Sequence, residues 1–427
     1  MINMVQNAKD QAAALAMAAY QAAVADGTLP QAEVKTAPVE IPKDTANGDF
    51  TTTFALAASK ALRQPPRNIA QALLDHMDLA GSYFASAEIA GPGFLNFRLN
   101  DSWYAAVCEA VESEGAGYGT ADHLKGQKIM VEFVSANPTG PMHMGNARGG
   151  VLGDTLASVL AACGADVTRE FYVNDAGHQI DKFAHSIEAR YLQIIRGEDA
   201  VPFHGKGYQR EHIKQRARHF ADLHGDGYQG EDIKDLARAY YEKNGDKLLD
   251  VPEAERQEAL AQFGLSINLP KMKTDLERYK IHYDNWFYES SLHESGYVKE
   301  TVDLLAERGW TYEKDGALWL RTADILRDHY RRQGKKEADI EKLDLKDDVL
   351  RRANGFYTYF AADIAYHRNK FAVRGFDKVI NIWGADHHGH VARLKGALDA
   401  LGLNGSERLD IVLMQPVKLL RDGEVVR

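Results

Sequence analysis

One short loop of the sequence combines residue types that can bind a phosphate group. The loop Ser135–Arg148 reads SANPTGPMHMGNAR and follows an apolar segment, Gln127–Val134. Its glycines and prolines make a stiff turn whose backbone can approach a ligand closely, and a helix that begins after it offers free N–H groups to an anion. His143 and Asn146, three residues apart, add polar donors directed to the same place. Because no GxxxxGKS/T pattern occurs, we expect a phosphate site that is not a P-loop.

The elements around this loop have the order of a βαβ unit. The pattern predicts a strand over Gln127–Val134, a helix over about Ala147–Cys163 and a second strand over Asp166–Val173. Such a unit belongs to a parallel, doubly wound sheet, which binds ligands outside the carboxyl ends of its strands. The loop Ser135–Arg148 would lie at that edge.

The C-terminal stretch, residues 346–427, returns to the same α/β character. We expect there a helix over Lys346–Phe371, a strand over Lys378–Trp383 running into GADHHGH, a helix over about Val391–Leu401 and a strand over Leu409–Met414. These elements and the βαβ unit read as two halves of one sheet, with the site in the cleft between them.

The stretch between the two halves, residues 178–350, is mostly charged and reads as a helical insertion with a hairpin at Gly309–Arg321. Residues 205–218 align with residues 225–238, which we interpret as a local duplication because two copies are too few for a solenoid. The GxGxxG match at Gly225–Gly230 lies in this stretch with no strand before it, so we treat it as chance.

The first 118 residues read as a separate small α+β domain. Helical patterns over Gln11–Asp26 and Pro66–Met77 precede a predicted hairpin of Ser86–Ile89 and Phe94–Leu99. The glycine-rich stretch Gly115–Gly119 marks the expected boundary. The alanine-rich start of the chain reads as an amphipathic helix and not as a signal peptide.

The composition bounds the function classes. The chain has 427 residues, 45% hydrophobic and 26% charged, which is typical of a globular protein of two or three domains. A net charge of −10 argues against a general nucleic-acid coat protein but not against an enzyme with a local basic surface. Cys108 and Cys163 are too few for a disulfide framework or a multi-cysteine zinc site, and they fit a reducing cytoplasm. No apolar run is long enough for a membrane span.

The motifs, taken together, resemble a known family. HMGN in its context is similar to the "HIGH" signature of class I aminoacyl-tRNA synthetases. The wider text VEFVSANPTGPMHMGNARGGVLGDTLA resembles arginyl-tRNA synthetases in particular, and the resemblance extends over essentially the whole chain. The other matching segments are YVNDAG, YFAADIAYH, GADHHGH, NGDFTTTFAL and GPGFLNFRL.

The resemblance implies a fold and an activity. The fold is α/β: residues 119–427 would form a class I catalytic domain with a Rossmann-type parallel sheet, whose halves are 119–190 and 346–427 and whose connective insertion is 191–345. Residues 1–118 would be the appended α+β domain that contacts tRNA. The activity would be an arginine–tRNA ligase that uses ATP with Mg²⁺ as substrate, forms arginyl-adenylate and charges tRNA(Arg), without a tightly bound cofactor. We expect a cytoplasmic monomer with no membrane partner.

Two features depart from the family pattern. Asn146 stands where most class I enzymes have histidine, and an amide can donate a hydrogen bond but carries no charge. Stabilisation of charge at the α-phosphate would then depend more on His143 and the helix N-terminus. The family's lysine-bearing KMSKS-type loop and anticodon-binding domain would follow Arg427, so we expect a truncated chain of low activity.

The resemblance also assigns site residues. His143 and Asn146 would be catalytic and, with Gly145, Gly384 and Asp386, would bind ATP. A guanidinium calls for carboxylates that accept paired hydrogen bonds. The expected arginine contacts are Glu132, Asn137, Tyr359, Asp363 and His387, of which Tyr359 and Asp363 are four apart on one helix face. The signature motif comprises Ala136, Asn137, Pro138, Thr139, Gly140, Pro141, Met142, His143, Met144, Gly145 and Asn146.

Several of these residues keep alternatives. Glu132 lies within an apolar strand, where its burial would need a cation that a substrate guanidinium or a protein arginine could supply. Asn174 and Asp175 fit a turn pair as well as a site. The zinc interpretation of the histidines in GADHHGH is disfavoured, because their spacing is not helical and no fourth ligand is near.

Basic residues offer a second ambiguity. Lys60, Arg63, Arg67 and the run Leu326–Glu337 could contact RNA phosphates or be solvated helix ends.

Two functions other than a ligase fit parts of the sequence. A non-catalytic binding module predicts a damaged signature, and a nucleotidyltransferase acting on a small metabolite predicts a shorter chain.

Overall fold

The computed structural model describes residues 3–198, 200–201, 228, 230–415, 417, 419–421 and 424–426. The chain divides into two compact units, Met1–Ala121 and Asp122–Arg427. The sequence placed this division at residue 118. The first copy of the predicted repeat, residues 205–218, and the start of the second copy lie outside the described residues.

The N-terminal unit is a small α+β domain built on an antiparallel sheet with strand order β1-β2-β4-β3. The predicted hairpin is confirmed, because β3 and β4 pair antiparallel. Its first helix starts earlier than predicted: Asn3 caps it by accepting a hydrogen bond from the Gln6 N–H, and buried alanines recur on one face. Its elements are α1 (Met4–Ala25), β1 (Val39–Glu40), β2 (Phe50–Thr52), α2 (Phe54–Leu62), α3 (Pro66–Asp75), β3 (Phe84–Ala90), β4 (Phe94–Leu99) and α4 (Asp101–Glu114).

The second unit is organised by a five-stranded sheet with order β12-β11-β5-β6-β7, in which every neighbouring pair is parallel. The four strands predicted from the sequence are confirmed, and β7 was not foreseen. It comes from the stretch that was predicted as a helical insertion, so that stretch contributes an edge strand to the main sheet. The strands are β5 (Lys128–Glu132), β6 (Asp166–Val173), β7 (Asn285–Tyr288), β11 (Lys378–Gly384) and β12 (Leu409–Met414).

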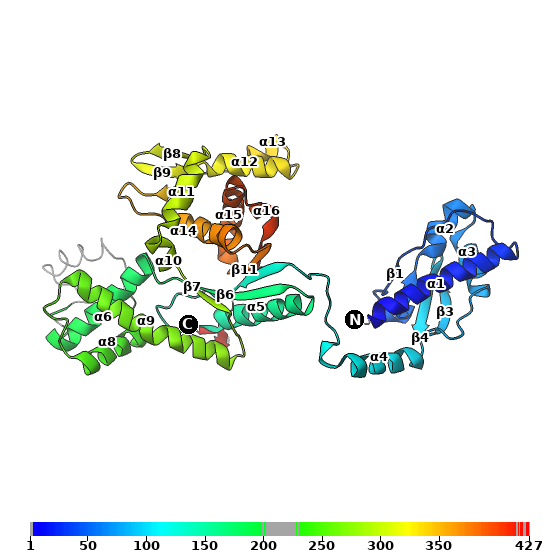
Figure 1. The fold of residues 1–427 in the computed structure, drawn as a ribbon, viewed down its shortest axis with the longest axis horizontal. Helices are drawn as coiled ribbons and strands as arrows, with labels where there is room; N and C mark the ends of the chain where they lie inside the picture. Colours follow the sequence, from blue (N-terminus) through cyan, green and yellow to red (C-terminus); the bar gives the residue numbers. More distant parts are fainter. Residues whose placement is uncertain are drawn as a thin grey trace. The chain divides into compact units, whose positions relative to one another are not determined.

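Helices cover both faces of this sheet (Figure 1). The side chains of β5 alternate between the faces: Val131 packs in the cluster that includes α5 (Met144–Ala162) and α9 (Glu253–Arg278), whereas Met130 packs in the cluster of α14 (Tyr359–Arg368) and α15 (His388–Ala400). Helix α5 approaches the sheet very closely, because a Cβ on Gly153 would lie 2.1 Å from Cγ of Phe133. This contact holds the α5 N-terminus at the carboxyl edge of β5.

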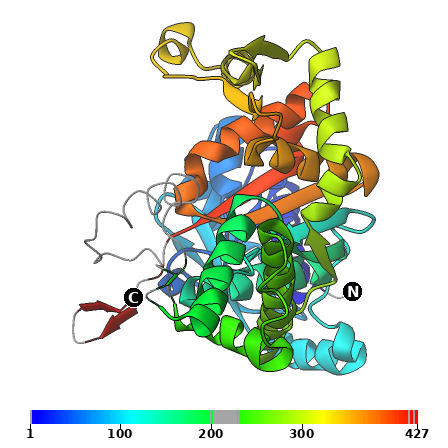
Figure 2. The same ribbon diagram turned by 90° about the vertical axis from the view of Figure 1, so that its left-hand side faces the viewer.

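The remaining elements form two groups (Figure 2). Helices α6 (His178–Arg196) and α8 (Glu231–Asn244) pack with α9 around buried Phe183 and Leu260. A three-stranded antiparallel sheet contains the predicted hairpin, which is confirmed. The strands of this sheet are β8 (Thr311–Lys314), β9 (Ala317–Leu320) and β10 (Asp348–Arg351). The other elements are α10 (Ser290–Glu294), α11 (Tyr297–Glu307), α12 (Thr322–Arg332), α13 (Glu337–Ile340), α16 (Gly405–Arg408), β13 (Leu419–Arg421) and β14 (Glu424–Val426).

The predicted helix over Lys346–Phe371 is wrong in its first half. Residues 348–351 form β10, which pairs antiparallel with β9. A turn with Gly355 at φ 87° follows, and α14 starts only at Tyr359, where the Thr358 hydroxyl accepts a hydrogen bond from the Ala361 N–H. Pairing with a distant strand therefore outweighs the helical pattern of this segment.

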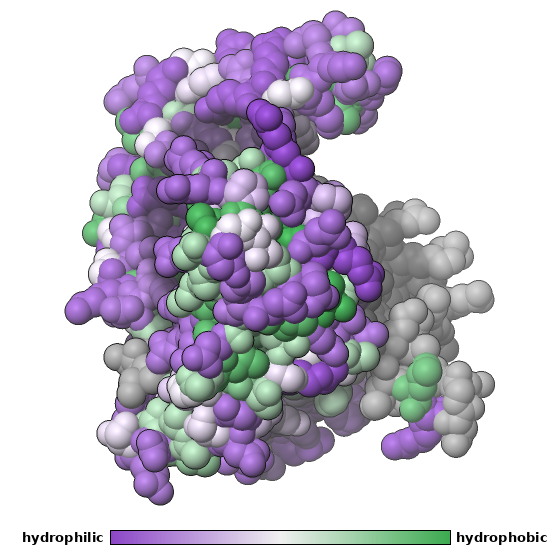
Figure 3. Space-filling view, turned by 90° about the vertical axis from the view of Figure 1, so that its right-hand side faces the viewer, coloured by the Kyte–Doolittle hydropathy of each residue, from purple (hydrophilic) through white to green (hydrophobic). Residues whose placement is uncertain are grey.

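No described helix is both long and apolar enough to cross a membrane. The face in Figure 3 is mostly hydrophilic, with smaller hydrophobic areas between the polar ones.

Candidate active site

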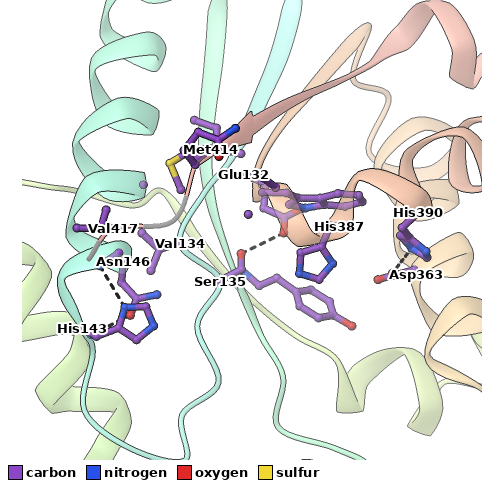
Figure 4. A pocket seen from close by; sticks show the side chains of 18 of the residues that line it. Glu132, Val134, Ser135, His143, Asn146, Asp363, His387, His390, Met414 and Val417 are labelled. Carbon is purple, nitrogen blue, oxygen red and sulfur yellow. Dashed lines mark hydrogen bonds and ion pairs between the residues drawn. The ribbon is translucent and has the colours of Figure 1, made fainter. Parts of the chain in front are cut away.

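A cavity of about 590 Å³ opens at the carboxyl ends of β5, β11 and β12. This is the edge at which doubly wound sheets bind ligands. In Figure 4, His143 and Asn146 lie on the α5 side, Asp363 and His390 lie on the opposite side, and Glu132 and Ser135 lie between them. The lining residues are Glu132, Val134, Ser135, His143, Gly145, Asn146, Gly149, Tyr172, Asp363, Tyr366, His367, Ile382, Trp383, Gly384, Ala385, His387, His390, Met414, Gln415 and Val417.

His143 and Asn146 form a capping box at the start of α5. His143 is the N-cap, and its Nδ1 accepts a hydrogen bond from the Gly145 N–H at 3.1 Å. The Asn146 Oδ1 accepts one from the His143 N–H at 2.9 Å. His143 Nδ1 therefore carries no proton, so Nε2 is the ring donor. Within the described part of the chain, the N–H groups of the Asn146 amide are left for a ligand. Both donors stand at the positive end of a helix.

The chain enters the site through a strained turn. Val134 and Ser135 have φ values of 68° and 43°, and a β-branched residue such as valine rarely adopts a positive φ. The turn brings the Ser135 hydroxyl back to the sheet, where it donates to Glu132 Oε1 at 3.0 Å and accepts from the Tyr172 N–H at 3.1 Å. The strain is thus tied to the placement of a polar group beside Glu132.

The Asp363 carboxylate is hydrogen-bonded to a histidine through one of its two oxygens. Its Oδ2 is 2.8 Å from His390 Nε2, and His390 Nδ1 is 3.4 Å from the guanidinium of Arg393. Because arginine only donates, the arrangement places the ring proton of His390 on Nε2, directed at Asp363. Arg393 is itself paired with Asp348 at 2.5 Å. The Asp363 carboxylate is therefore oriented and still lines the cavity.

The structure brings together seven of the ten residues predicted as catalytic or as arginine or ATP contacts, whereas the rest of the signature motif is not among the residues that line the cavity. Those that line the cavity are Glu132, His143, Gly145, Asn146, Asp363, Gly384 and His387. Asn137 is exposed and Tyr359 is 44% exposed, and neither is among the lining residues. The Tyr359 ring lies beside Gly177 instead. The side chain of Asp386 lies outside the described part of the chain.

Two of the open alternatives can be followed in the structure. Asp175 accepts hydrogen bonds from the backbone N–H and the hydroxyl of Ser290, so it fastens the start of α10. Of the histidines in GADHHGH, His390 donates to Asp363.

Comparisons with known proteins identify the family of the chain. A family profile described as "Arginyl tRNA synthetase N terminal domain" matches residues 11–99, and one described as "tRNA synthetases class I (R), catalytic domain" matches residues 109–409. The arginine–tRNA ligase of Acetivibrio thermocellus is 47% identical over the whole chain, which spans 69% of that relative's length. The chain belongs to the arginyl-tRNA synthetase family. The ligase of Caldanaerobacter subterraneus is 46% identical over the same share of each chain.

Solved structures of the family share the fold. A provisionally named arginyl-tRNA synthetase from Campylobacter jejuni aligns with a TM-score of 0.59 at 33% identity, over 77% of this chain and 63% of that one. The Thermus thermophilus arginyl-tRNA synthetase aligns with a TM-score of 0.54 over 94% of this chain and 65% of that one. At 22% identity, the second likeness concerns the fold alone.

In this member of the arginyl-tRNA synthetase family, Ser135 and His390 at the cavity and Lys370 behind it have contacts that the sequence did not predict. Lys370 supplies the cation that buried Glu132 needs, where the sequence suggested a substrate guanidinium or an arginine. His390 was considered only as a metal ligand, and Ser135 only as the start of the loop. A lysine inside NKFAV, directly after the motif that contains Asp363, was the one available signal for Lys370.

Proposed function

We propose that this chain activates L-arginine with ATP to form arginyl-adenylate and transfers the arginine to tRNA(Arg). One observation carries the proposal: two carboxylates, Glu132 and Asp363, line the same cavity as the capping box of His143 and Asn146. The first pair has the chemistry to bind a guanidinium, and the second stands where a phosphate would be stabilised.

The amino-acid side of the cavity suits a cation. Asp363 has one oxygen held by His390, which leaves its other oxygen to accept from a guanidinium N–H. His387 lines the same side, and its role as an amino-acid contact belongs to this proposal. Tyr359 and Asn137 stand outside the cavity lining, so their proposed contacts would need the substrate or the loop to reach them.

The phosphate side of the cavity suits an in-line displacement. The arginine carboxylate would attack the α-phosphate, and negative charge would develop on the phosphate oxygens. His143 Nε2 and the Asn146 amide are the side-chain donors there, and the α5 N-terminus adds its dipole. Gly145 and Gly384 leave room for ATP, and Mg²⁺ would arrive as part of the nucleotide substrate.

Calorimetry of arginine binding tests the amino-acid assignment. We expect the chain to bind arginine in preference to lysine and citrulline, and Asp363→Ala to weaken arginine binding by about 10- to 100-fold, since hydrogen bonds between charged groups contribute about 1.5–3 kcal/mol. Asp410→Ala is the matched control, because Asp410 pairs with Lys378 at the opposite end of the sheet. Equal binding of arginine and citrulline would refute the carboxylate pocket.

The expected partners and location follow from the same proposal. We place tRNA contacts on the N-terminal unit, where exposed Lys60, Arg63 and Arg67 lie around the junction of α2 and α3. Cys108 and Cys163 are free thiols, which supports action in a reducing cytoplasm. We expect a monomer, and the low activity anticipated for the 427 residues stays a prediction.

A further inference from the structure

A row of polar side chains crosses the centre of the main sheet. Asn381 on β11, Glu132 on β5, Glu170 on β6 and Asn285 on β7 are neighbours in the strand register. The first three are buried, so two carboxylates lie side by side inside the protein. Two neighbouring negative charges in the protein interior are unfavourable unless cations compensate them.

Two cations from the segment after α14 compensate this row. Lys370, fully buried, contacts Glu132 Oε2 at 2.5 Å and Asn381 Oδ1 at 3.3 Å. Arg374, four residues further along the chain, donates hydrogen bonds to both carboxylate oxygens of Glu170. The Lys370 ammonium also lies 4.0 Å from the ring centroid of Tyr366, whose hydroxyl donates to Glu170. The two carboxylates and two cations cancel in charge.

The same network extends to the second carboxylate of the cavity. Asn381 Nδ2 is 2.7 Å from His367 Nε2, and His367 Nδ1 is 2.8 Å from the carbonyl oxygen of Asp363. Because Asn381 donates and the carbonyl accepts, His367 is neutral with its proton on Nδ1. Burial holds the pKa of His367 well below its usual value, and the nearby Lys370 charge adds to the effect. A chain of contacts thus runs from Glu132 to the backbone of Asp363.

We infer that Lys370 is a positioning residue that keeps Glu132 ionised and fixed at the floor of the arginine pocket. The inference rests on the proposed function and adds to it a residue that does not line the cavity. Among the described residues, each Glu132 oxygen has one hydrogen-bond partner, Lys370 or Ser135, and a carboxylate oxygen can accept two hydrogen bonds. Glu132 therefore keeps acceptor sites for a substrate while its charge is balanced from behind.

The titratable groups packed around Glu132 each keep one charge state near neutral pH. Burial raises the pKa of Tyr172, Tyr283 and Tyr366, so these side chains stay neutral. Burial would raise the pKa of Glu170, but Arg374 and Lys370 hold it below its usual value. Burial lowers the pKa of Lys370, and the charges of Glu132 and Glu170 act in the opposite direction. Removing the lysine would leave a buried carboxylate without a cation, and such a group takes up a proton.

The test combines arginine binding and thermal unfolding of Lys370→Met between pH 5 and pH 9. We expect arginine binding at pH 7 to weaken at least about 10-fold relative to the unaltered chain, because an unpaired buried carboxylate is protonated. The loss should shrink as the pH rises, since Glu132 then ionises. The fall in melting temperature should grow over the same range, because an unpaired charge becomes buried. At each pH the arginine affinity of the variant is divided by that of the unaltered chain. Effects of pH on the substrate and on His143, His387 and His390, which both proteins share, then cancel.

Three variants accompany it. Lys370→Met with Glu132→Gln should bind arginine weakly but without the pH dependence, and should melt higher than Lys370→Met at pH 8. Lys370→Arg keeps the cation and should remove the pH dependence. Lys378→Met is the matched control, because it breaks a lysine–carboxylate pair with Asp410 at the other end of β11 and should leave arginine binding unchanged.

The outcomes separate the inference from the proposed function. Equal arginine binding by Lys370→Met and the unaltered chain at every pH would overturn the inference, and so would a pH-independent fall in melting temperature. Failure of Lys370→Met to fold, with the double variant folded, would support it. If neither Lys370→Met nor the double variant folds, Lys370→Arg decides the question. Its arginine binding, relative to the unaltered chain, must not change with pH, and a change with pH would overturn the inference. If the unaltered chain does not bind arginine, the proposed function fails, and the melting data still decide whether Lys370 holds the Glu132 charge.

Discussion

The two sheets of this chain are stabilised in different ways. The antiparallel sheet of the N-terminal unit packs apolar side chains, including Phe50, Phe84 and Phe97, against its helices. Among the described residues of that unit, the buried polar side chains are Thr52, Ser82 and Asn96, which carry no charge. The parallel sheet of the second unit instead carries Glu132 and Glu170 through its centre.

The difference shows what a binding site requires of its scaffold. An apolar core needs only volume and shape, so it tolerates rearrangement as long as both are kept. A buried charge row needs each partner in place, because removing one exposes the remaining charge to a low-dielectric interior. We therefore expect the second unit to be sensitive to charge and pH where the first unit is sensitive to volume.

Breaking the charge row should give the largest effect. Arg374→Met leaves Glu170, which has no exposed surface, without its main cation and should cost about 3–5 kcal/mol of unfolding free energy. The low pKa of Glu170 contributes stability above its unfolded pKa of about 4.3, and this is lost as the pH falls. Without Arg374, burial should raise the pKa of Glu170 above its unfolded value, so the variant loses stability as the pH rises through that range. Its deficit should therefore be larger at pH 8 than at pH 5, as measured by urea unfolding.

An exposed ion pair in the other unit provides the control for this prediction. Arg98 and Glu88 pair at 3.4 Å, and both side chains are about half exposed. Arg98→Met should cost no more than about 1 kcal/mol. An equal loss in Arg98→Met and Arg374→Met, or a deficit of Arg374→Met that does not change with pH, would contradict the contrast drawn between the sheets.

A volume change in the apolar sheet should give an intermediate effect. Phe97 is fully buried, and its ring centroid lies 5.0 Å from that of Phe84. Phe97→Leu keeps an apolar side chain but leaves a gap, and it should cost about 1–2 kcal/mol. The loss should be the same at pH 5 and pH 8, because no titrating group changes its environment. A pH-dependent loss in calorimetric unfolding would show that the N-terminal core is coupled to charged groups.

The sequence predicted the parts of the second unit that local patterns encode. Strands β5, β11 and β12 are mostly apolar runs bounded by loops, and β6 follows from its place in the βαβ order. The glycine- and proline-rich loop after β5 indicated the site edge. The signature motif added His143, Gly145 and Asn146 to the residues that line the cavity. These features depend on neighbours in the chain, so one sequence is enough to identify them.

Features that depend on register could not be predicted from the sequence. Strand β7 and the replacement of a helix by β10 both follow from pairing with strands far away in the chain. The contact of Lys370 with Glu132 requires β5, β11 and the segment after α14 to be placed together first. The position of Lys370 within NKFAV is only a weak local signal, because most lysines are exposed and full burial depends on a carboxylate partner that is distant in the sequence.

The smallest predicted effect concerns a surface pair that joins the ends of two N-terminal helices. His76 Nε2 lies 2.6 Å from Asp26 Oδ2, which raises the pKa of His76 and lowers that of Asp26 to about 2. The histidine contributes stability below about pH 6.5, lost as the pH rises through its raised pKa, and the aspartate contributes above about pH 3.9, lost as the pH falls towards 2. The melting temperature of His76→Gln should therefore fall below that of the unaltered chain most clearly between those limits. A difference that persists unchanged to pH 9 would mean that the His76 ring stabilises the helix ends by packing and not by charge.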